Sequence, residues 1–401
     1  MIKGNLIVSQ SGGPTPVINS SLVGVVHEAL RQDRIGKIYG ALYGIEGVLN
    51  EDLIDLRKES PETLELLRQT PGSALGMSRR KLTPDDYGRI LDVFKAHNIR
   101  YFFYIGGNDS MDTSNKVSKM ALERNYELYV VGVPKTVDND LVITDHCPGY
   151  GSAARFVANT VRDTGVDTMS GFRSTPVKIV EMMGRHAGWV TAAAVLGKKT
   201  EEDPPHLVYV PERPVTVEEI LDDIQEAHKK YGGVVVAVSE GVTNPDGQPL
   251  MTAAKTVDSF GHIQLGGVSV WLAQQVQDEL GLKCRFEKPD TMQRSSIIMA
   301  SLVDQEEAYR VGCDAVRFAV EGQSDCMVAL KRDPGPEYHC STSPVPLAEV
   351  ANREKLLPDE MIGADGRSIT QAFVDYALPL IGGELMPYGK LKGYPVPKML
   401  P

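Results

Sequence analysis

The sequence predicts an α/β protein with two Rossmann-like, doubly wound domains whose mostly parallel sheets face each other across a cleft, plus a C-terminal capping tail. Three observations lead to this prediction. Short runs rich in β-branched and aromatic residues alternate with longer segments of helical periodicity. Two such series follow one another within 401 residues, a length sufficient for two domains. Glycine-rich or polar loops follow several runs, at the sheet edge where ligands bind in such folds.

The first series begins with an apolar run at 5–9, a turn containing Gly12 and Gly13, and a segment of helical periodicity at 17–30. The amides of a glycine turn between a strand and a helix can bind phosphate. A plain β–α turn is the other reading of the same residues. Further strands are expected at 38–42, 101–105 and 128–133, and helices at 61–69, 84–97 and 110–124.

The second series starts near Gly149, where the same alternation resumes. Long helical patterns also occur between 295 and 318, and a short helix is expected at 370–376. From Asp333 onward, proline and glycine punctuate short helical segments. We expect helices at 153–163, 188–196 and 217–231, and strands at 177–181, 207–210 and 234–238.

The composition excludes several classes of protein. A net charge of −11 argues against a general nucleic-acid binder, and it means that an anionic substrate needs a local basic cluster. Five widely spaced cysteines without a C-x-x-C pair are typical of reduced thiols. The N-terminus enters a strand without a signal peptide, and no apolar run approaches 18 residues. We therefore expect a cytoplasmic protein that does not contact membranes.

Two loops carry the chemistry. Residues 106–110 (Gly-Gly-Asn-Asp-Ser) follow one expected strand, and residues 134–140 (Pro-Lys-Thr-Val-Asp-Asn-Asp) follow the next. The first loop offers glycines and amides for phosphate, whereas the second offers a lysine, a hydroxyl and two carboxylates. The Asp-Asn-Asp run could also form a simple Asx-type turn. Together the two loops favour phosphoryl transfer between anionic small molecules.

These loops resemble those of the phosphofructokinase family, which has a GGDGS or GGDDS loop, a P-x-TIDND loop, an MGR turn and a late QR segment. The last two are matched by 183–185 and 293–294, in the family's order. The resemblance covers roughly residues 5–330. It implies a phosphoryl-donor domain at 1–148 and about 298–337, a sugar-phosphate domain at 149–297 and a capping tail at 338–401. It also implies Mg²⁺ as cofactor and a homodimer or homotetramer.

The resemblance assigns the general base to Asp138, the first aspartate of the TIDND-like segment. A sugar hydroxyl that attacks a phosphoryl group must lose a proton, and a nearby carboxylate can accept it. Thr136 and Val137 accompany Asp138 at the sugar's 1-hydroxyl end. Asp140 offers an oxygen ligand to Mg²⁺, and Asn108 stands where the family more often has a metal-associated aspartate.

Asp109 and Lys135 indicate the phosphoryl donor. ATP-dependent members carry glycine at the position of Asp109 and often at that of Lys135, which leaves room for a nucleotide's α-phosphate. A carboxylate fills that space and repels the phosphate, while a lysine places its charge on the diphosphate. The pair therefore resembles the pyrophosphate-dependent branch of the family.

The sugar phosphate is expected to bind residues from several segments. Arg185 can bind a phosphate, and Glu240 matches a family glutamate that accepts hydrogen bonds from sugar hydroxyls. Arg79 resembles an arginine that contacts the transferred phosphate. Residues 79–81 could also be a solvated basic face. Residues 261–267 resemble the family's GHIQRGG, but Leu265 replaces the arginine that binds the sugar's 6-phosphate. We therefore assign that role to Arg294 and read 259–283 as an insertion with a helix. Pro176 replaces another family arginine, with Arg173 or Lys178 as candidate substitutes. The full expected set is Gly13, Arg79, Thr136, Val137, Asp138, Met183, Gly184, Arg185, Glu240, Arg285, Thr291, Met292, Gln293 and Arg294.

The sequence thus predicts a pyrophosphate-dependent phosphofructokinase that converts fructose 6-phosphate and pyrophosphate to fructose 1,6-bisphosphate and phosphate, reversibly. Two alternatives within the fold are an ATP-dependent 6-phosphofructokinase and a pyrophosphate-dependent kinase of another sugar phosphate, such as sedoheptulose 7-phosphate. A non-enzymatic sugar-phosphate sensor is a third. The carboxylates of Asp138 and Asp140 argue against a sensor, because a sensor needs no base beside an anion.

Overall fold

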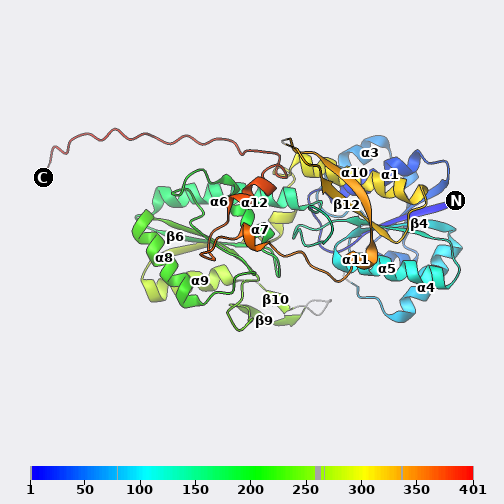
Figure 1. Cartoon of the computed structure of the whole chain (residues 1–401), viewed down its shortest axis with the longest axis horizontal. Helices are drawn as coiled ribbons and strands as arrows, with labels where there is room; N and C mark the ends of the chain where they lie inside the picture. Colours follow the sequence, from blue (N-terminus) through cyan, green and yellow to red (C-terminus); the bar gives the residue numbers. More distant parts are fainter. Residues whose placement is uncertain (1, 79, 258–262, 266, 336, 401) are drawn as a thin grey trace.

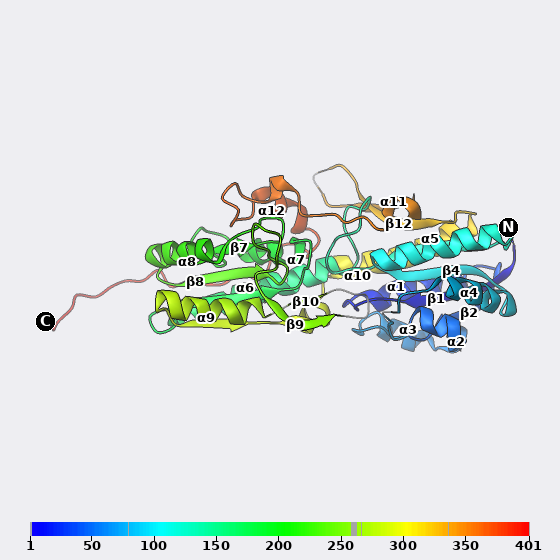
Figure 2. The same ribbon diagram turned by 90° about the horizontal axis from the view of Figure 1, so that it is seen from below.

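The computed structural model describes residues 2–78, 80–257, 263–265, 267–335 and 337–400. The chain forms two lobes that lie side by side, each built on one β-sheet with helices around it (Figures 1 and 2). The α/β fold class is therefore confirmed. The five cysteines are all free thiols. Within the described ranges, no helix is both long enough and apolar enough to cross a membrane.

The larger lobe contains a seven-stranded sheet with the strand order β13-β12-β5-β4-β1-β2-β3. Its inner strands are parallel, whereas β3 and β13 run antiparallel to their neighbours at the two edges. The strands are β1 (Gly4–Gln10), β2 (Ile35–Ala41), β3 (Leu53–Asp55), β4 (Ile99–Gly106), β5 (Tyr129–Pro134), β12 (Cys326–Arg332) and β13 (Cys340–Pro346).

Helices cover both faces of this sheet because its buried side chains alternate. In β4, Tyr101 and Phe103 pack on one face, and Phe102 and Tyr104 on the other. The first face is covered by α1 (Ile18–Leu30), α3 (Pro61–Leu67) and α10 (Leu302–Val320), and the second by α2 (Ile45–Asn50), α4 (Pro84–Ala96), α5 (Asn108–Glu123) and α11 (Leu347–Val350).

Glycines allow α1 and α10 to approach closely. A Cβ atom on Gly24 would lie 2.1 Å from the carbonyl oxygen of Tyr309, and one on Gly312 would lie 2.1 Å from that of Ser21. Both distances are far below a van der Waals contact. The two helices therefore pack backbone to backbone, and α10 joins the larger lobe although it follows the smaller lobe in sequence.

The smaller lobe contains a parallel four-stranded sheet with the order β11-β6-β8-β7. Its strands are β6 (Val177–Met182), β7 (Leu207–Tyr209), β8 (Val234–Ser239) and β11 (Cys284–Glu287), and β9 (Thr252–Val257) pairs separately with β10 (Ile263–Leu265). One face packs against α6 (Tyr150–Gly171), α7 (Trp189–Ala192) and α12 (Gln371–Ala377), and the other against α8 (Val217–Tyr231) and α9 (Val268–Leu280). Short 3₁₀ helices are η1 (Leu56–Lys58), η2 (Ala193–Gly197), η3 (Asp290–Arg294) and η4 (Asp359–Met361).

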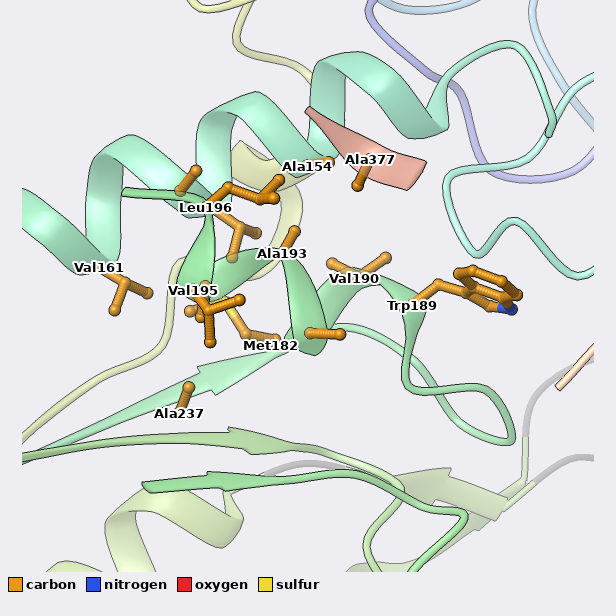
Figure 3. Packing of buried hydrophobic residues seen from close by; sticks show 14 of the residues in the cluster. Ala154, Val161, Met182, Trp189, Val190, Ala193, Val195, Leu196, Ala237 and Ala377 are labelled. Carbon is orange, nitrogen blue, oxygen red and sulfur yellow. The ribbon is translucent and has the colours of Figure 1, made fainter. Parts of the chain in front are cut away.

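The core on the α6 face is made largely of small and branched side chains. Figure 3 shows Ala154 and Val161 of α6 facing Val195 and Leu196 of η2, with Met182 below them. Small residues let these segments pack closely. Trp189 closes this core at the side that adjoins the larger lobe.

The bounds of most expected elements agree with the structure to within a few residues. The helix expected at 153–163 runs from Tyr150 to Gly171, whereas the one expected at 188–196 is only a short α-helix that continues as η2. Helix α2 and strands β3, β11 and β12 were not expected. The segment read as a capping tail begins with β13 of the larger sheet and gives Leu357 and Phe373 to the core of the smaller lobe. The assignment of the two domains to donor and sugar phosphate remains a prediction.

Candidate active site

Three loops meet at the carboxyl edge of the larger sheet. Strands β1, β4 and β5 are adjacent and parallel, so the loops after Gln10, Gly106 and Pro134 lie next to one another. The amide of Lys135 donates to the carbonyl of Gly106 at 3.0 Å, and the amide of Ser11 donates to the carbonyl of Ile105 at 2.9 Å. The glycine turn, the 106–110 loop and the 134–140 loop therefore form one surface.

Two cationic side chains contact the glycine turn. The Nζ atom of Lys135 donates to the carbonyl oxygen of Gly13 at 2.7 Å, and Lys135 is buried. Gly12 has a φ of 70°, which glycine adopts without strain. A Cβ atom on Gly13 would lie 2.3 Å from a guanidinium nitrogen of Arg294. Glycine at position 13 thus allows Arg294 to reach the turn from η3.

The turn after β5 holds two carboxylates at alternate positions. The Oγ1 atom of Thr136 accepts from the amide of Asp138 at 3.0 Å, which is an ST-type turn. Asn139 has a φ of 57°, and its side chain accepts from the amide of Cys147 at 3.0 Å. Val137 is buried. The Asx-type turn that the Asp-Asn-Asp run could form is thus replaced by an anchored loop that presents Asp138 and Asp140.

Charges from both lobes act on Asp138. Burial, and after it the carboxylates of Asp140 and Glu240, raise the pKa of Asp138 to about 7, although Lys135 and Arg185 act to lower it. Asp140 and Lys135 belong to the larger lobe, while Glu240 follows β8 and Arg185 follows β6 of the smaller lobe. The structure therefore brings five of the expected site residues together where the lobes meet. A carboxyl group that titrates near neutrality can accept a proton in a reaction.

The start of α5 lies beside this turn and supplies further polar groups. Asn108 is the first residue of α5, and Asp109 is exposed in its first turn. Among the described residues, neither side-chain atom of the Asn108 amide has a hydrogen-bond partner, and the same holds for Oδ1 of Asp140. Buried polar atoms without partners are uncommon, and buried oxygen atoms of this kind suit a bound metal ion that prefers oxygen. No group of three histidine, cysteine, aspartate or glutamate side chains in the described ranges forms a metal site by itself.

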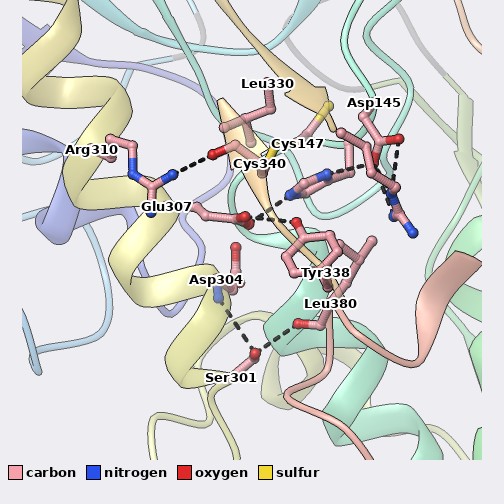
Figure 4. Close-up of polar contacts among 12 residues, drawn as sticks. Asp145, Cys147, Ser301, Asp304, Glu307, Arg310, Leu330, Tyr338, Cys340 and Leu380 are labelled. Atoms are coloured by element: carbon pink, nitrogen blue, oxygen red, sulfur yellow. Dashed lines mark hydrogen bonds and ion pairs between the residues drawn. The ribbon is translucent and has the colours of Figure 1, made fainter. Parts of the chain in front are cut away.

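A buried ionic cluster anchors the far end of the same loop (Figure 4). His146 lies between Asp145, at 2.8 Å, and Glu307 of α10, at 2.7 Å. Burial alone would lower the pKa of His146, but the two carboxylates raise it to about 9. Tyr338 donates to Glu307 at 2.6 Å, and Asp304 accepts from the amides at the start of α6. The loop is therefore fixed to α10 behind the site.

The turn after β6 joins Glu240 and the η3 segment. Gly184 has a φ of 132°, and its amide donates to Oε1 of Glu240 at 3.4 Å. The amide of Met183 donates to the side chain of Gln293 at 3.1 Å. Because Gln293 is buried beside Arg294, these contacts connect the expected Met-Gly-Arg turn to the late Gln-Arg segment.

Other expected residues lie apart from this group. Arg285 is exposed on the edge strand β11, and no hydrogen bond or ion pair joins it to other expected residues that the structure describes. Thr291 and Met292 are exposed on η3. Lys178, a candidate substitute for the family arginine, is buried on β6 and pairs with Glu287 at 3.1 Å.

Two features named in the sequence analysis cannot be placed. Arg79 lies outside the described residues, as does the start of the segment that resembles GHIQRGG.

The sequence analysis missed residues of the segment after α11. Glu354 lies near Asp140, whose pKa is raised by burial and then by the charge of Glu354. It also pairs with Nδ1 of His186 at 3.0 Å. Lys355 donates from its backbone amide to the carbonyl of Asp140 at 2.7 Å. The surrounding sequence is a short charged stretch without periodicity or motif, so it carried no signal of these contacts.

Comparisons with known proteins agree with the fold. The sequence model of the family described as "Phosphofructokinase" matches residues 5–319. A pyrophosphate–fructose 6-phosphate 1-phosphotransferase from Halomonas elongata is 45% identical over 96% of this chain and 94% of its own length. A sulfofructose kinase from Alkalicoccus urumqiensis is 37% identical over 88% of this chain and 91% of its own.

A crystal structure of a pyrophosphate-dependent phosphofructokinase from Marinobacter aquaeolei has a TM-score of 0.87 and 41% identity, covering 100% of this chain and 98% of that one. The similarity thus extends beyond the part matched by the family model and includes the segment after α11. Family members generally use a divalent metal ion. The match over most of the length, together with these relatives, shows that the chain belongs to the phosphofructokinase family.

Proposed function

We propose that this chain transfers a phosphoryl group from pyrophosphate to the 1-hydroxyl of fructose 6-phosphate, reversibly, in glycolysis and gluconeogenesis. The relatives named for this reaction, which match nearly the whole chain, support the proposal. The observation that carries it is the position of Asp138 among Lys135, Arg185 and Glu240, from two lobes. A base near two cationic groups suits this reaction, because the attacking hydroxyl belongs to one anion, the sugar phosphate, and attacks another, pyrophosphate.

In this reaction Asp138 accepts the proton of the sugar's 1-hydroxyl, whose oxygen forms the new bond to phosphorus. The bridging P–O bond of pyrophosphate breaks, and the leaving group is inorganic phosphate. Lys135, held on the glycine turn, faces the negative charge of the diphosphate. Arg185, Glu240 and Arg294 belong to the binding site of the sugar phosphate. Positioning and electrostatic stabilisation supply most of the catalysis of phosphoryl transfer.

The metal ion in this proposal is Mg²⁺, held through Asn108 and Asp140. Their partnerless buried oxygens support this assignment, because Mg²⁺ prefers oxygen ligands and keeps several of its waters. Bound there, the ion would neutralise charge on the phosphates. The cytoplasmic location and a homodimeric or homotetrameric state are part of the same proposal, and light scattering of the purified protein tests the latter.

The donor assignment rests on Asp109 and Lys135. Asp109 is exposed at the start of α5, beside the loop that carries Asn108. A carboxylate at this place repels the α-phosphate of a nucleotide, which pyrophosphate lacks. The double change Asp109→Gly, Lys135→Gly is expected to reduce pyrophosphate use strongly and to allow some ATP use. Asp109→Gly alone should gain less, since the two residues face one ligand.

A coupled assay with fructose 6-phosphate, Mg²⁺ and either pyrophosphate or ATP tests the proposal. We expect turnover with pyrophosphate and negligible turnover with ATP. The matched control carries Asp33→Gly and Lys37→Gly, which remove the same charges from exposed positions on β2 and the turn before it. This control should keep the wild-type donor preference. Robust ATP-dependent turnover by the unmodified chain would contradict the donor assignment.

The acceptor is tested in the same assay. The similarity to a sulfofructose kinase favours one further candidate, an anionic sugar other than fructose 6-phosphate. Sedoheptulose 7-phosphate and a sulfonated fructose are therefore assayed as acceptors with both donors. We expect fructose 6-phosphate to give the highest kcat/KM, and a higher value for another acceptor would replace it in the proposal.

A further inference from the structure

Residues 353–357, here called the strap, cross from one lobe to the other. Figure 1 shows the chain running from α11, on the larger lobe, to α12, on the smaller lobe. The strap lies between these helices and beyond the residues matched by the family's sequence model. Lys355 of the strap contacts the loop that carries Asp138 and Asp140, and Leu357 lies in the core of the smaller lobe.

Lys355 binds the catalytic loop with both its backbone and its side chain. Its amide donates to the carbonyl of Asp140 at 2.7 Å. Its Nζ atom donates to the carbonyl of Thr144 at 3.2 Å and to that of Asp145 at 2.8 Å. One residue therefore connects the beginning and the end of the segment 140–145, which leads from the carboxylates to the buried His146 cluster.

The other side of Lys355 contacts the smaller lobe. The indole nitrogen of Trp189 donates to the carbonyl of Lys355 at 2.9 Å, and the Lys355 ammonium lies 5.2 Å from the centroid of the Trp189 ring. Trp189 is buried at the start of α7, just after the turn that carries Arg185. The amide of Leu357 donates to Oε1 of Glu212 at 2.8 Å, and the same oxygen accepts from Gly188 at 2.9 Å.

These contacts give Lys355 a place between the two halves of the site. Asp138 and Asp140 belong to the larger lobe, whereas Arg185 belongs to the smaller one. A misplacement of about 1 Å between reacting groups can cost a factor of about 10² in rate. Lys355, which bonds directly to the loop of the carboxylates and to Trp189, four residues after Arg185, can set that distance.

We infer that Lys355 is a positioning residue for phosphoryl transfer, which holds the Asp138 loop in register with the Arg185 turn across the lobe junction. The inference rests on the proposed function. Lys355 itself contacts carbonyl groups and an indole ring, so it acts through Asp138 and does not touch the reacting atoms in this arrangement. The expected effect of its loss is therefore on kcat.

The test uses the full-length chain with Lys355→Met, which keeps the length of the side chain and removes its donors. We expect kcat to fall roughly 10- to 100-fold, with KM for the sugar phosphate changed less than threefold. Lys355→Arg, which restores a cation and donors, should recover most of the lost kcat. Arg353→Met is the matched control, because it removes an exposed cation from the same strap and should keep wild-type kcat. If the methionine variant does not fold, Lys355→Gln replaces it.

A double-mutant cycle separates positioning from general destabilisation. If Lys355 acts through Asp138, adding Lys355→Met to Asp138→Asn should lower kcat by less than threefold. Equal losses in the two backgrounds, or a Lys355→Met kcat within twofold of wild type, would overturn the inference. Wild-type turnover of pyrophosphate and fructose 6-phosphate tests the proposed function separately. The variants are compared with the wild type on the donor and acceptor that the wild type uses. The proposed function and the positioning role of Lys355 can therefore fail independently.

Discussion

Replacing His146 by glutamine should remove a pH-dependent part of the folding stability. The carboxylates of Asp145 and Glu307 raise the pKa of the buried His146 from 6.5 to about 9. This rise corresponds to roughly 3 kcal/mol, at about 1.4 kcal/mol for each tenfold change in proton affinity. Because the folded-state pKa is the higher one, the contribution is complete below pH 6.5 and is lost as the pH rises to about 9.

Urea unfolding of the wild type and of His146→Gln, at about pH 6.5 and about pH 9.5, measures this contribution. The wild type should lose roughly 3 kcal/mol more than the variant between these two conditions. His206→Gln is the matched control. Burial lowers the pKa of His206 to about 4, so this histidine is neutral throughout the window and its removal should leave the pH dependence unchanged. Equal losses for the wild type and His146→Gln would refute the reasoning.

Three further predictions concern activity and packing. Asp138→Asn should lower kcat by roughly 10²- to 10⁴-fold with little change in sugar-phosphate affinity, measured by steady-state kinetics and calorimetry; near-wild-type turnover would remove Asp138 from its role. Arg294→Ala should raise KM for fructose 6-phosphate by the equivalent of about 2–5 kcal/mol, and an unchanged KM would show that Arg294 serves only the glycine turn. Gly24→Ala should lower stability by about 1–3 kcal/mol, whereas Gly171→Ala, which meets no atom within 4 Å, should not; equal melting temperatures would contradict the close packing of α1 and α10.

Local signals explain why most elements could be predicted from the sequence. Helix α8 was expected with its observed bounds, because Thr216 and Glu219 form a capping box and Gly232 follows its last turn. Strand β8 begins with a continuous apolar run, 234–238, that is buried on both faces. By contrast, β12 was missed because the partner that defines it, β5, is far away in the sequence. The other partner of β12 is β13, which contains proline and serine, and these residues do not indicate a strand.

The residues of the candidate site also differ in whether a local sequence signal marks them. Asp138, Asp140 and Lys135 could be found because a motif directly follows a strand, and the carboxyl ends of adjacent parallel strands meet. The contact of Arg294 with Gly13 could not be found, since nothing in either segment specifies the other. Lys355 and Glu354 carried no signal either, because their contacts depend on where the chain crosses between the lobes. The expectation for Arg285 is neither supported nor contradicted by its exposed position.

The order of strands in the larger sheet has a consequence for synthesis on the ribosome. Strand β5 pairs with β12, which is made only after all four strands of the smaller sheet. Until then the nascent sheet carries an open edge at β5, with unpaired backbone groups that other chains could join. Because β12 must close a long loop before it docks, completion of this sheet is a late step of folding. The smaller sheet can form before it, so the chain can assemble the sheet of its second lobe before it has finished the sheet of its first.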